Sequence, residues 1–177
     1  MAEPIEILNP TAMDYAIRRI AHEIAERNAC STDLVLLGIP AGGIYFARRL
    51  SEVLAAICGH PIPAGSLDVT MHRDDLDQRA TPEVHPTDIP VDLTGKVVVL
   101  VDDVIFRGRT ARAALDALND LGRPRRIQLA ALIDRGHREL PITADFVGKN
   151  VPTAAHERID VRWKESGGAD QVVLLKP

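Results

Sequence analysis

The chain has 177 residues, of which 46% are hydrophobic and only 3% aromatic, so it can bury an aliphatic core without a disulfide or a metal. No apolar run approaches the roughly 18 residues of a membrane span, which argues against a membrane protein. The net charge of −4 argues against general attraction of polyanions, so a nucleic acid partner would need a local basic patch. We expect one α/β domain over residues 1–177.

The cysteines and the N-terminus favour a cytoplasmic protein. Cys30 and Cys58 lack the spacing of metal ligands, so we interpret both as unpaired packing residues in a reducing compartment. The N-terminal residues MAEPIEIL contain no basic segment followed by an apolar one, the pattern of a secretory signal.

The first half of the chain predicts a helix followed by a strand, a loop and a second helix. Apolar residues at helical spacing predict an amphipathic helix from Asn9 to Arg27. Leu34 to Gly38 is a short apolar run that predicts a strand, and a helical pattern follows from Gly42 through Ile57. Another strand is expected at about Leu67 to Met71. The polar stretch His72 to Asp88 then predicts a mobile loop or hairpin.

The second half predicts a strand–helix–strand unit. Lys96 to Val101 reads KVVVLV and is the strongest strand pattern; a helix is expected from Thr110 to Leu121 and a strand from Ile127 to Ile133. Such a unit implies parallel strands with a right-handed crossover, which puts the loop after Val101 at the carboxyl edge of the sheet. Further short strands are expected near Phe146, Val161 to Trp163 and Val172 to Leu175.

The segment Val98 to Thr110, VVLVDDVIFRGRT, carries the chemistry. A glycine turn at a helix N-terminus presents free N–H groups to a phosphate, and Thr110 can cap that helix or donate its hydroxyl to the phosphate. Asp102 and Asp103 supply acceptors for ribose hydroxyls, although only one faces the site if the strand continues. The pattern predicts a ribose 5-phosphate site; alternatively, the acids merely end a strand and Gly108 is an ordinary loop glycine.

This segment resembles the signature of type I phosphoribosyltransferases, and its flanks are similar to the PyrR family. The similar stretches include RIAHEI, LDVTMHRDDL, DIPVDLTGK, DDVIFRGRTARAALDAL and GRPRRIQLAALIDRGHRELPITADFVGKNVPT. The resemblance covers nearly the whole chain, and LIDRGHRELP is its most family-specific tract. It implies a central, mainly parallel sheet flanked by helices, a lid at residues 72–88, and a small hood with the C-terminal strands at residues 134–177.

The resemblance implies transfer of a phosphoribosyl group from 5-phosphoribosyl 1-diphosphate (PRPP) to N1 of uracil, giving UMP and diphosphate. Mg²⁺ would be bound through PRPP, without a dedicated protein site. Asp102, Asp103 and Arg73 are the implied catalytic residues, and Arg73 would contact the diphosphate. The residues implied to bind PRPP or UMP are Ala41, Gly42, Asp102, Asp103, Val104, Ile105, Phe106, Arg107, Gly108, Arg109, Thr110, Arg135 and Val161.

Two departures from the family pattern concern the anion sites. Where the family carries Thr-Arg-Gly in its diphosphate loop, this chain has Ala41, Gly42 and Gly43, which removes a hydroxyl and a guanidinium. Arg107 replaces a usual Thr, so a cation either supplements the phosphate site or obstructs it. The alternative function is therefore a catalytically weak or inactive nucleotide-sensing regulator.

The resemblance also implies UMP-responsive RNA binding that regulates pyrimidine biosynthesis genes by transcription attenuation. The RNA would be a leader loop bound across a homodimer or homotetramer. The implied RNA-binding residues are Arg19, His22, Arg27, His137, Arg138 and Lys149. Thr143, Ala154 and Ala155 replace polar or basic residues and thin this patch, and the same cations suit an ordinary solvated face.

Two rival classes share part of the pattern. A phosphorylated receiver domain would carry its acids near the first strand and a lysine late in the sheet, whereas here the acids follow a central strand. A purine or orotate phosphoribosyltransferase would share the phosphate loop, and the tract DRGHREL argues against it.

Overall fold

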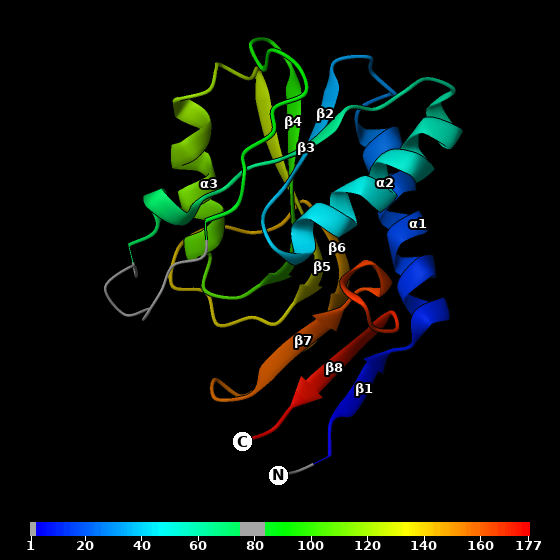
Figure 1. The fold of residues 1–177 in the computed structure, drawn as a ribbon, viewed down its shortest axis with the longest axis vertical. Coiled ribbons are helices and arrows are strands. Elements are labelled where there is room, and N and C mark those ends of the chain that lie inside the picture. Colours follow the sequence, from blue (N-terminus) through cyan, green and yellow to red (C-terminus); the bar gives the residue numbers. More distant parts are fainter. Residues whose placement is uncertain (1–2, 75–83) are drawn as a thin grey trace.

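Two β-sheets form the framework of the protein, whose computed structural model describes residues 3–74 and 84–177. The larger sheet is parallel, with order β3-β2-β4-β5-β6, and the smaller sheet is antiparallel, with order β1-β8-β7. The larger sheet contains β2 (Leu34–Gly38), β3 (Ala64–Ser66), β4 (Val97–Ile105), β5 (Arg126–Asp134) and β6 (Phe146–Asn150). The smaller sheet contains β1 (Ile5–Leu8), β7 (Arg158–Arg162) and β8 (Gln171–Leu175), and it lies beside both chain ends (Figure 1).

Three α-helices cover the two faces of the larger sheet. α1 (Pro10–Arg27) and α2 (Gly42–Cys58) lie on one face, and α3 (Arg109–Asn119) lies on the other (Figure 1). Each face has its own buried aliphatic cluster, which explains why β2 and β4 are apolar along both of their faces. The predicted α/β class and the mainly parallel central sheet are therefore confirmed.

The predicted helices form where local signals agree with tertiary packing. Asn9 caps α1 through a 2.8 Å hydrogen bond that its Oδ1 accepts from the Ala12 amide, and Pro10 occupies the first turn. Ile17, Ile20 and Ile24 form the buried stripe of that helix. No helix among the described residues is long and apolar enough to cross a membrane.

The structure corrects one predicted strand and extends another. Leu67 to Met71 is not a strand: β3 ends at Ser66, and a 3₁₀ turn, η1 (Thr70–His72), follows. The carboxylate of Asp68 starts this turn, since its Oδ1 accepts hydrogen bonds from the amide and hydroxyl of Thr70. β4 continues beyond the predicted Val101 to Ile105. Most of the predicted lid, residues 75–83, lies outside the described residues.

Cys30 and Cys58 form a disulfide, so the prediction that both are unpaired is wrong. α1 and α2 pack side by side, and the turn after α1 brings Cys30 next to the last residue of α2, with a Cα–Cα distance of 5.2 Å. The pairing depends on this tertiary contact between segments 28 residues apart, which the sequence pattern did not reveal.

The first turn of α2 packs against the backbone of β4 so closely that only glycine fits at residue 43. An ideal Cβ on Gly43 would lie 2.3 Å from the carbonyl oxygen of Val101. We expect Gly43→Ala to lower the free energy of unfolding by about 1–3 kcal/mol, the cost of overpacking, in urea denaturation. Gly168→Ala is the matched control, because no described atom lies within 4 Å of its Cβ position. Equal losses in the two variants would contradict the steric explanation.

Candidate active site

The turn between β4 and α3 carries the predicted phosphate-binding groups. Gly108 has a φ of 89°, in the left-handed region that favours glycine, and it is the N-cap of α3. The N–H groups of the following turn have no intrahelical acceptor and lie at the positive end of the helix dipole. Thr110 is the second residue of the helix, so its predicted role as a cap is excluded. Its hydroxyl instead accepts a 2.8 Å hydrogen bond from Nη1 of Arg73.

The two adjacent acids point to opposite faces of the sheet, because β4 continues through both of them. Asp102 is 9% exposed and lines a cavity beside α3. Asp103 lies against α2 instead: an ideal Cβ on Gly42 would be 2.0 Å from its Oδ2. The strand therefore aims one carboxyl at each of two helix N-termini.

Burial raises the pKa of Asp102 well above its ordinary value, and the adjacent Asp103 carboxyl raises it further, whereas Arg73 lowers it. Burial also raises the pKa of Asp103, although a hydrogen bond with Asp102 opposes this shift. The Asp103 amide donates a 2.9 Å hydrogen bond to Oδ1 of Asp102. Ionising both of these buried neighbouring carboxyls at once is therefore unfavourable.

The raised pKa of Asp102 predicts that Asp102→Asn stabilises the protein at neutral pH. Between the ordinary pKa of 3.8 and the raised folded value, the folded state binds more protons than the unfolded state. The stabilising contribution of the protonated group is therefore complete at low pH and is lost as the pH rises through the folded pKa. Asparagine stays neutral and keeps an acceptor for the Asp103 amide.

Thermal unfolding should therefore show a higher midpoint for Asp102→Asn at about pH 7.5, with the difference shrinking toward about pH 4. A difference that does not change with pH would show that the charge of Asp102 does not cause it.

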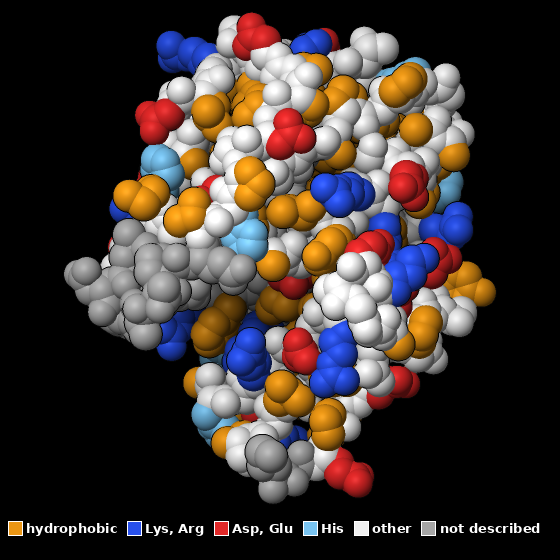
Figure 2. Space-filling model, viewed as in Figure 1, with side chains coloured by type: hydrophobic (Ala, Val, Ile, Leu, Met, Phe, Trp, Pro, Cys, Tyr) orange, Lys and Arg blue, Asp and Glu red, His pale blue; other side chains and the backbone are white. Residues whose placement is uncertain are grey.

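A cavity of about 460 Å³ lies over the turn between β4 and α3. We call residues 106–110 the phosphate turn. Figure 2 shows this side of the molecule hollowed between the main body and the lobe that holds the chain ends, with basic side chains beside the hollow. The lining residues are Arg73, Asp74, Asp102, Val104, Ile105, Phe106, Arg107, Gly108, Arg109, Thr110, Ala111 and Glu139.

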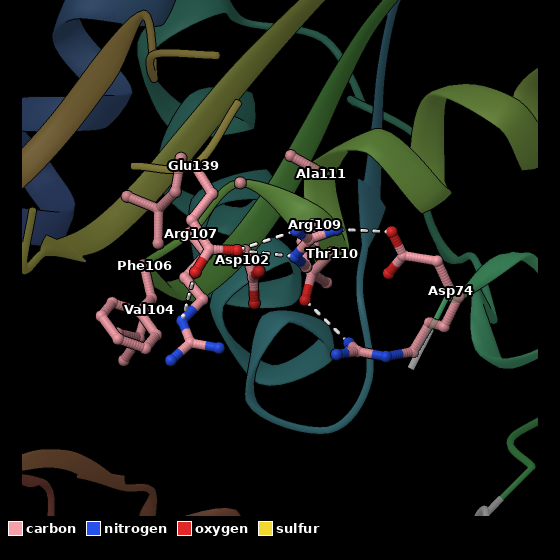
Figure 3. A pocket seen from close by; sticks show the side chains of 12 residues that line it. Asp74, Asp102, Val104, Phe106, Arg107, Arg109, Thr110, Ala111 and Glu139 are labelled. Carbon is pink, nitrogen blue, oxygen red and sulfur yellow. Dashed lines mark hydrogen bonds and ion pairs between the residues drawn. The ribbon is translucent and has the colours of Figure 1, made fainter. Parts of the chain in front are cut away.

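Ion pairs connect the walls of this cavity. Arg109 lies between two carboxylates, with Nη1 2.6 Å from Oδ2 of Asp74 and Nη2 2.8 Å from Oε2 of Glu139 (Figure 3). Nε of Arg107 lies 3.2 Å from the other Glu139 oxygen, and Nη1 of Arg112 lies 3.2 Å from Asp74. A phosphate entering the cavity would compete with these carboxylates for the arginines.

The tract after β5 forms a packed wall around Phe106. Arg135 is 6% exposed, with Cζ 3.9 Å from the centre of the Phe106 ring, and burial lowers the pKa of its guanidinium. Nη1 of Arg138 donates a 2.8 Å hydrogen bond to the Phe106 carbonyl, and its Nη2 pairs with Asp134. The ring of His137 meets Phe106 edge-on at 5.8 Å. These contacts attach the tract directly to the phosphate turn.

The comparisons with known proteins agree with this geometry. Residues 5–166 match the family described as phosphoribosyl transferase domain. A relative from Chloroflexus aurantiacus named Bifunctional protein PyrR is 57% identical over 177 residues, which cover 99% of this chain and 97% of the relative. The chain belongs to the PyrR family. Relatives of the same name from Enterococcus faecalis and Thermus aquaticus are 52% and 56% identical, covering 97% and 96% of this chain and 96% and 94% of their own lengths.

Solved structures confirm the phosphoribosyltransferase fold of this PyrR-family chain. The hypoxanthine phosphoribosyltransferase of Trypanosoma cruzi has a TM-score of 0.75 at 19% identity, covering 99% of this chain and 98% of its own. A hypoxanthine-guanine phosphoribosyltransferase from Bacillus anthracis has a TM-score of 0.68 at 20% identity, covering 83% of each chain. At these identities the likeness shows the fold alone.

In this PyrR-family chain, the structure brings most of the predicted site together. Arg73, Asp102 and every residue from Val104 to Thr110 line the cavity. Arg135 lies behind Phe106, and Val161 pairs with Val172 across β7 and β8. Ala41 is the N-cap of α2 and Gly42 is its first residue; neither lines the cavity, and Gly42 lies against Asp103 instead.

Two acids of the cavity were not predicted from the sequence. Asp74 follows Arg73 in the charged segment after η1, and Glu139 lies in the family-specific tract. Asp74 pairs with Arg109, and Glu139 pairs with both Arg107 and Arg109. The sequence held one signal for these acids. The segment FRGRTAR contains three arginines, and clustered cations of this kind favour acidic partners nearby.

The cations predicted to bind RNA in this PyrR-family chain fall into two groups. Arg19, His22 and Arg27 lie on α1 near edge strand β6, which carries Lys149. Arg19 donates hydrogen bonds to the carbonyls of Val147 and Gly148, and Arg27 pairs with Asp145 at 3.3 Å. His137 and Arg138 instead belong to the wall around Phe106.

Proposed function

We propose that this chain is a uracil phosphoribosyltransferase that converts uracil and PRPP to UMP and diphosphate. The observation that carries the proposal is one cavity that combines a glycine turn at the N-terminus of α3 with the carboxyl of Asp102. A phosphate binds the free amides of such a turn, and a ribose attached to it lies within reach of the strand end. PyrR-family membership at 57% identity supports the choice of this reaction.

Positioning and electrostatic stabilisation accomplish the reaction, without a protein nucleophile. The amides from Phe106 to Thr110 bind the 5′-phosphate. Asp102 holds the ribose hydroxyls from the cavity, and Asp103 joins it when its carboxyl turns from Gly42 toward the ribose. N1 of uracil forms its bond to C1 of the ribose while the bond from C1 to the diphosphate oxygen breaks, and the N1 proton passes to the departing diphosphate. Developing positive charge on the ribose ring is stabilised by the nearby carboxylates, and Arg73 with the first turn of α2 stabilises the departing diphosphate.

Mg²⁺ bound through PRPP would supply charge neutralisation at the diphosphate. The residues fit this role, because the Asp102 carboxyl lines the cavity and Mg²⁺ bound through substrate oxygens would need few protein ligands. Residues 134–177, which include the C-terminal strands, contribute the hood over the base, with Arg135 and Val161 beside it.

Nucleotide synthesis tests the enzyme against its rivals. Incubation with PRPP and Mg²⁺ should give nucleotide with uracil and none with hypoxanthine, guanine or orotate, as measured by chromatography. Product from a purine or from orotate would identify another base specificity. No product with any base, combined with binding of UMP in calorimetry, would instead establish the nucleotide-sensing regulator without transferase activity.

A second function, UMP-responsive binding of a pyrimidine leader RNA, is supported by the relatives' name, Bifunctional protein PyrR. Arg19, His22, Arg27 and Lys149 supply cations along α1 and β6, and His137 and Arg138 join the RNA surface to the nucleotide site through their contacts with Phe106. In filter binding, UMP should tighten binding of the organism's own leader RNA, and affinity should fall with salt. Specific binding absent both with and without UMP would reject this function.

The protein acts as a homodimer or homotetramer in the cytoplasm. Its proposed substrates, PRPP and uracil, are intracellular metabolites, and an RNA loop needs a wider surface than one α1 helix offers. Sedimentation and cell fractionation are the direct measurements.

A further inference from the structure

The first turn of α2 is a second helix N-terminus directed at the acid pair. An ideal Cβ on Gly43 would lie 3.3 Å from Cα of Asp102, and one on Gly42 would lie 2.0 Å from Oδ2 of Asp103. α2 is 17 residues long and has no side-chain cap, so its first amides lack a side-chain acceptor at the N-cap. The Asp103 carboxyl lies directly against this turn.

Trp163 brings a hydrogen-bond donor to the same point. Its side chain is 1% exposed, and among the described residues its Nε1 has no hydrogen-bond partner. The Cβ position of Gly42 lies 3.0 Å from this Nε1, so the indole N–H is directed at the first turn of α2. A buried donor without an acceptor is costly in a folded protein, which indicates that this group acquires a partner in a functional state.

Packing holds the indole in place. The ring stacks on Phe46 at a centroid distance of 6.0 Å, and the guanidinium of Arg49 lies 4.9 Å over its centre. Arg49 in turn pairs with Glu165 at 2.6 Å and Asp170 at 2.7 Å, one on each side of the turn after Trp163. The donor is thus fixed before any ligand arrives, the arrangement expected of a binding group.

We propose that Trp163 is a diphosphate-binding residue, whose Nε1–H donates to an oxygen of the diphosphate of PRPP after Asp103 turns from Gly42 toward the ribose. This inference rests on the proposed function. PRPP carries anionic groups on two sides of its ribose, and β4 aims one acid at the N-terminus of α3 and the next at that of α2. With the 5′-phosphate at α3, the diphosphate meets the amides of Gly42 and Gly43 together with the indole N–H.

Trp163 is the single tryptophan of the chain, so its emission reports this site directly. Inorganic diphosphate with Mg²⁺ should change the intensity and wavelength of emission in a saturable way. Ribose 5-phosphate, which carries no diphosphate, should leave the emission nearly unchanged while binding in calorimetry.

Trp163→Phe keeps an aromatic ring on Phe46 and under Arg49 but removes the donor. We expect the Kd for inorganic diphosphate and the KM for PRPP to rise about tenfold or more, the effect of losing a hydrogen bond to a charged group. kcat should stay within about twofold, and the Kd for ribose 5-phosphate should not change. A purely structural role would alter both ligands, together with the thermal midpoint.

Gly42→Ala is a second test of the same site if Trp163→Phe folds poorly. This variant retains the indole and places a methyl group between Trp163 and Asp103. It should also weaken diphosphate more than ribose 5-phosphate. Folded variants that bind diphosphate as tightly as the unaltered protein would overturn the role of Trp163. If the unaltered protein binds neither ribose 5-phosphate nor UMP, the proposed function itself fails.

Discussion

Asp102→Asn should lower kcat/KM for the reaction of uracil with PRPP by about 100-fold, the size of effect expected when a group that orients or stabilises the reacting centre is removed. Asp102 is the carboxyl that β4 directs into the cavity, next to the amides of the phosphate turn. The amide of asparagine cannot supply negative charge to the ribose ring as the bond to diphosphate breaks. Steady-state kinetics with both substrates varied is the measurement.

Asp116→Asn provides the matched control on the neighbouring helix. Asp116 is exposed on α3 and makes only a 3.8 Å ion pair with Arg112 among the described residues, so kcat/KM should be unchanged. If Asp102→Asn keeps full activity, the role of this carboxyl in catalysis is wrong. Asp102→Asn should also be more stable than the unaltered protein at neutral pH. A loss of activity in this variant therefore cannot come from unfolding.

Gly108→Val should weaken UMP binding by about 10- to 100-fold, because the phosphate turn cannot keep its shape. Gly108 has a φ of 89°, where a residue with a side chain pays about 1–2 kcal/mol of strain and a β-branched one is rare. Relaxing that strain rotates the peptide groups whose amides are directed at the phosphate. Isothermal calorimetry with UMP measures the loss.

Gly59→Val is the control that separates the cost of backbone strain from the loss of UMP binding. Gly59 also has a positive φ, 73°, and no described atom lies within 4 Å of its Cβ position, but it ends α2 instead of starting α3. Both variants should lose similar stability, whereas only Gly108→Val should lose UMP affinity. Equal UMP affinities for the two would show that the turn at Gly108 does not bind the phosphate.

The sequence predicted the strand, turn and helix at residues 97–119 because the signals for them are local. A buried strand, two acids, a glycine and the start of a helix follow one another within 13 residues. Each of these signals depends on neighbouring residues and not on distant segments. The direction of the acids depended on where β4 ends. The pattern of apolar residues stops at Val101, but pairing with β5 continues to Ile105, so the ladder extends through polar residues.

The features that were missed depend on contacts between distant segments. The disulfide of Cys30 requires α1 and α2 to lie side by side, and the position of Trp163 requires the turn after β7 to pack on α2. Thr110 failed as a predicted cap because a left-handed glycine at position 108 starts the helix earlier. Local propensity contains none of this information.

The hydrogen bonds from Arg19 to Val147 and Gly148 bear on how copies of the chain can associate. β6 is the outermost strand of the larger sheet, and an exposed strand of this kind is a template on which another chain can extend the sheet. A guanidinium attached to two of its carbonyls blocks such growth at that point. We therefore expect copies of the chain to associate without extending the five-stranded sheet at its β6 edge.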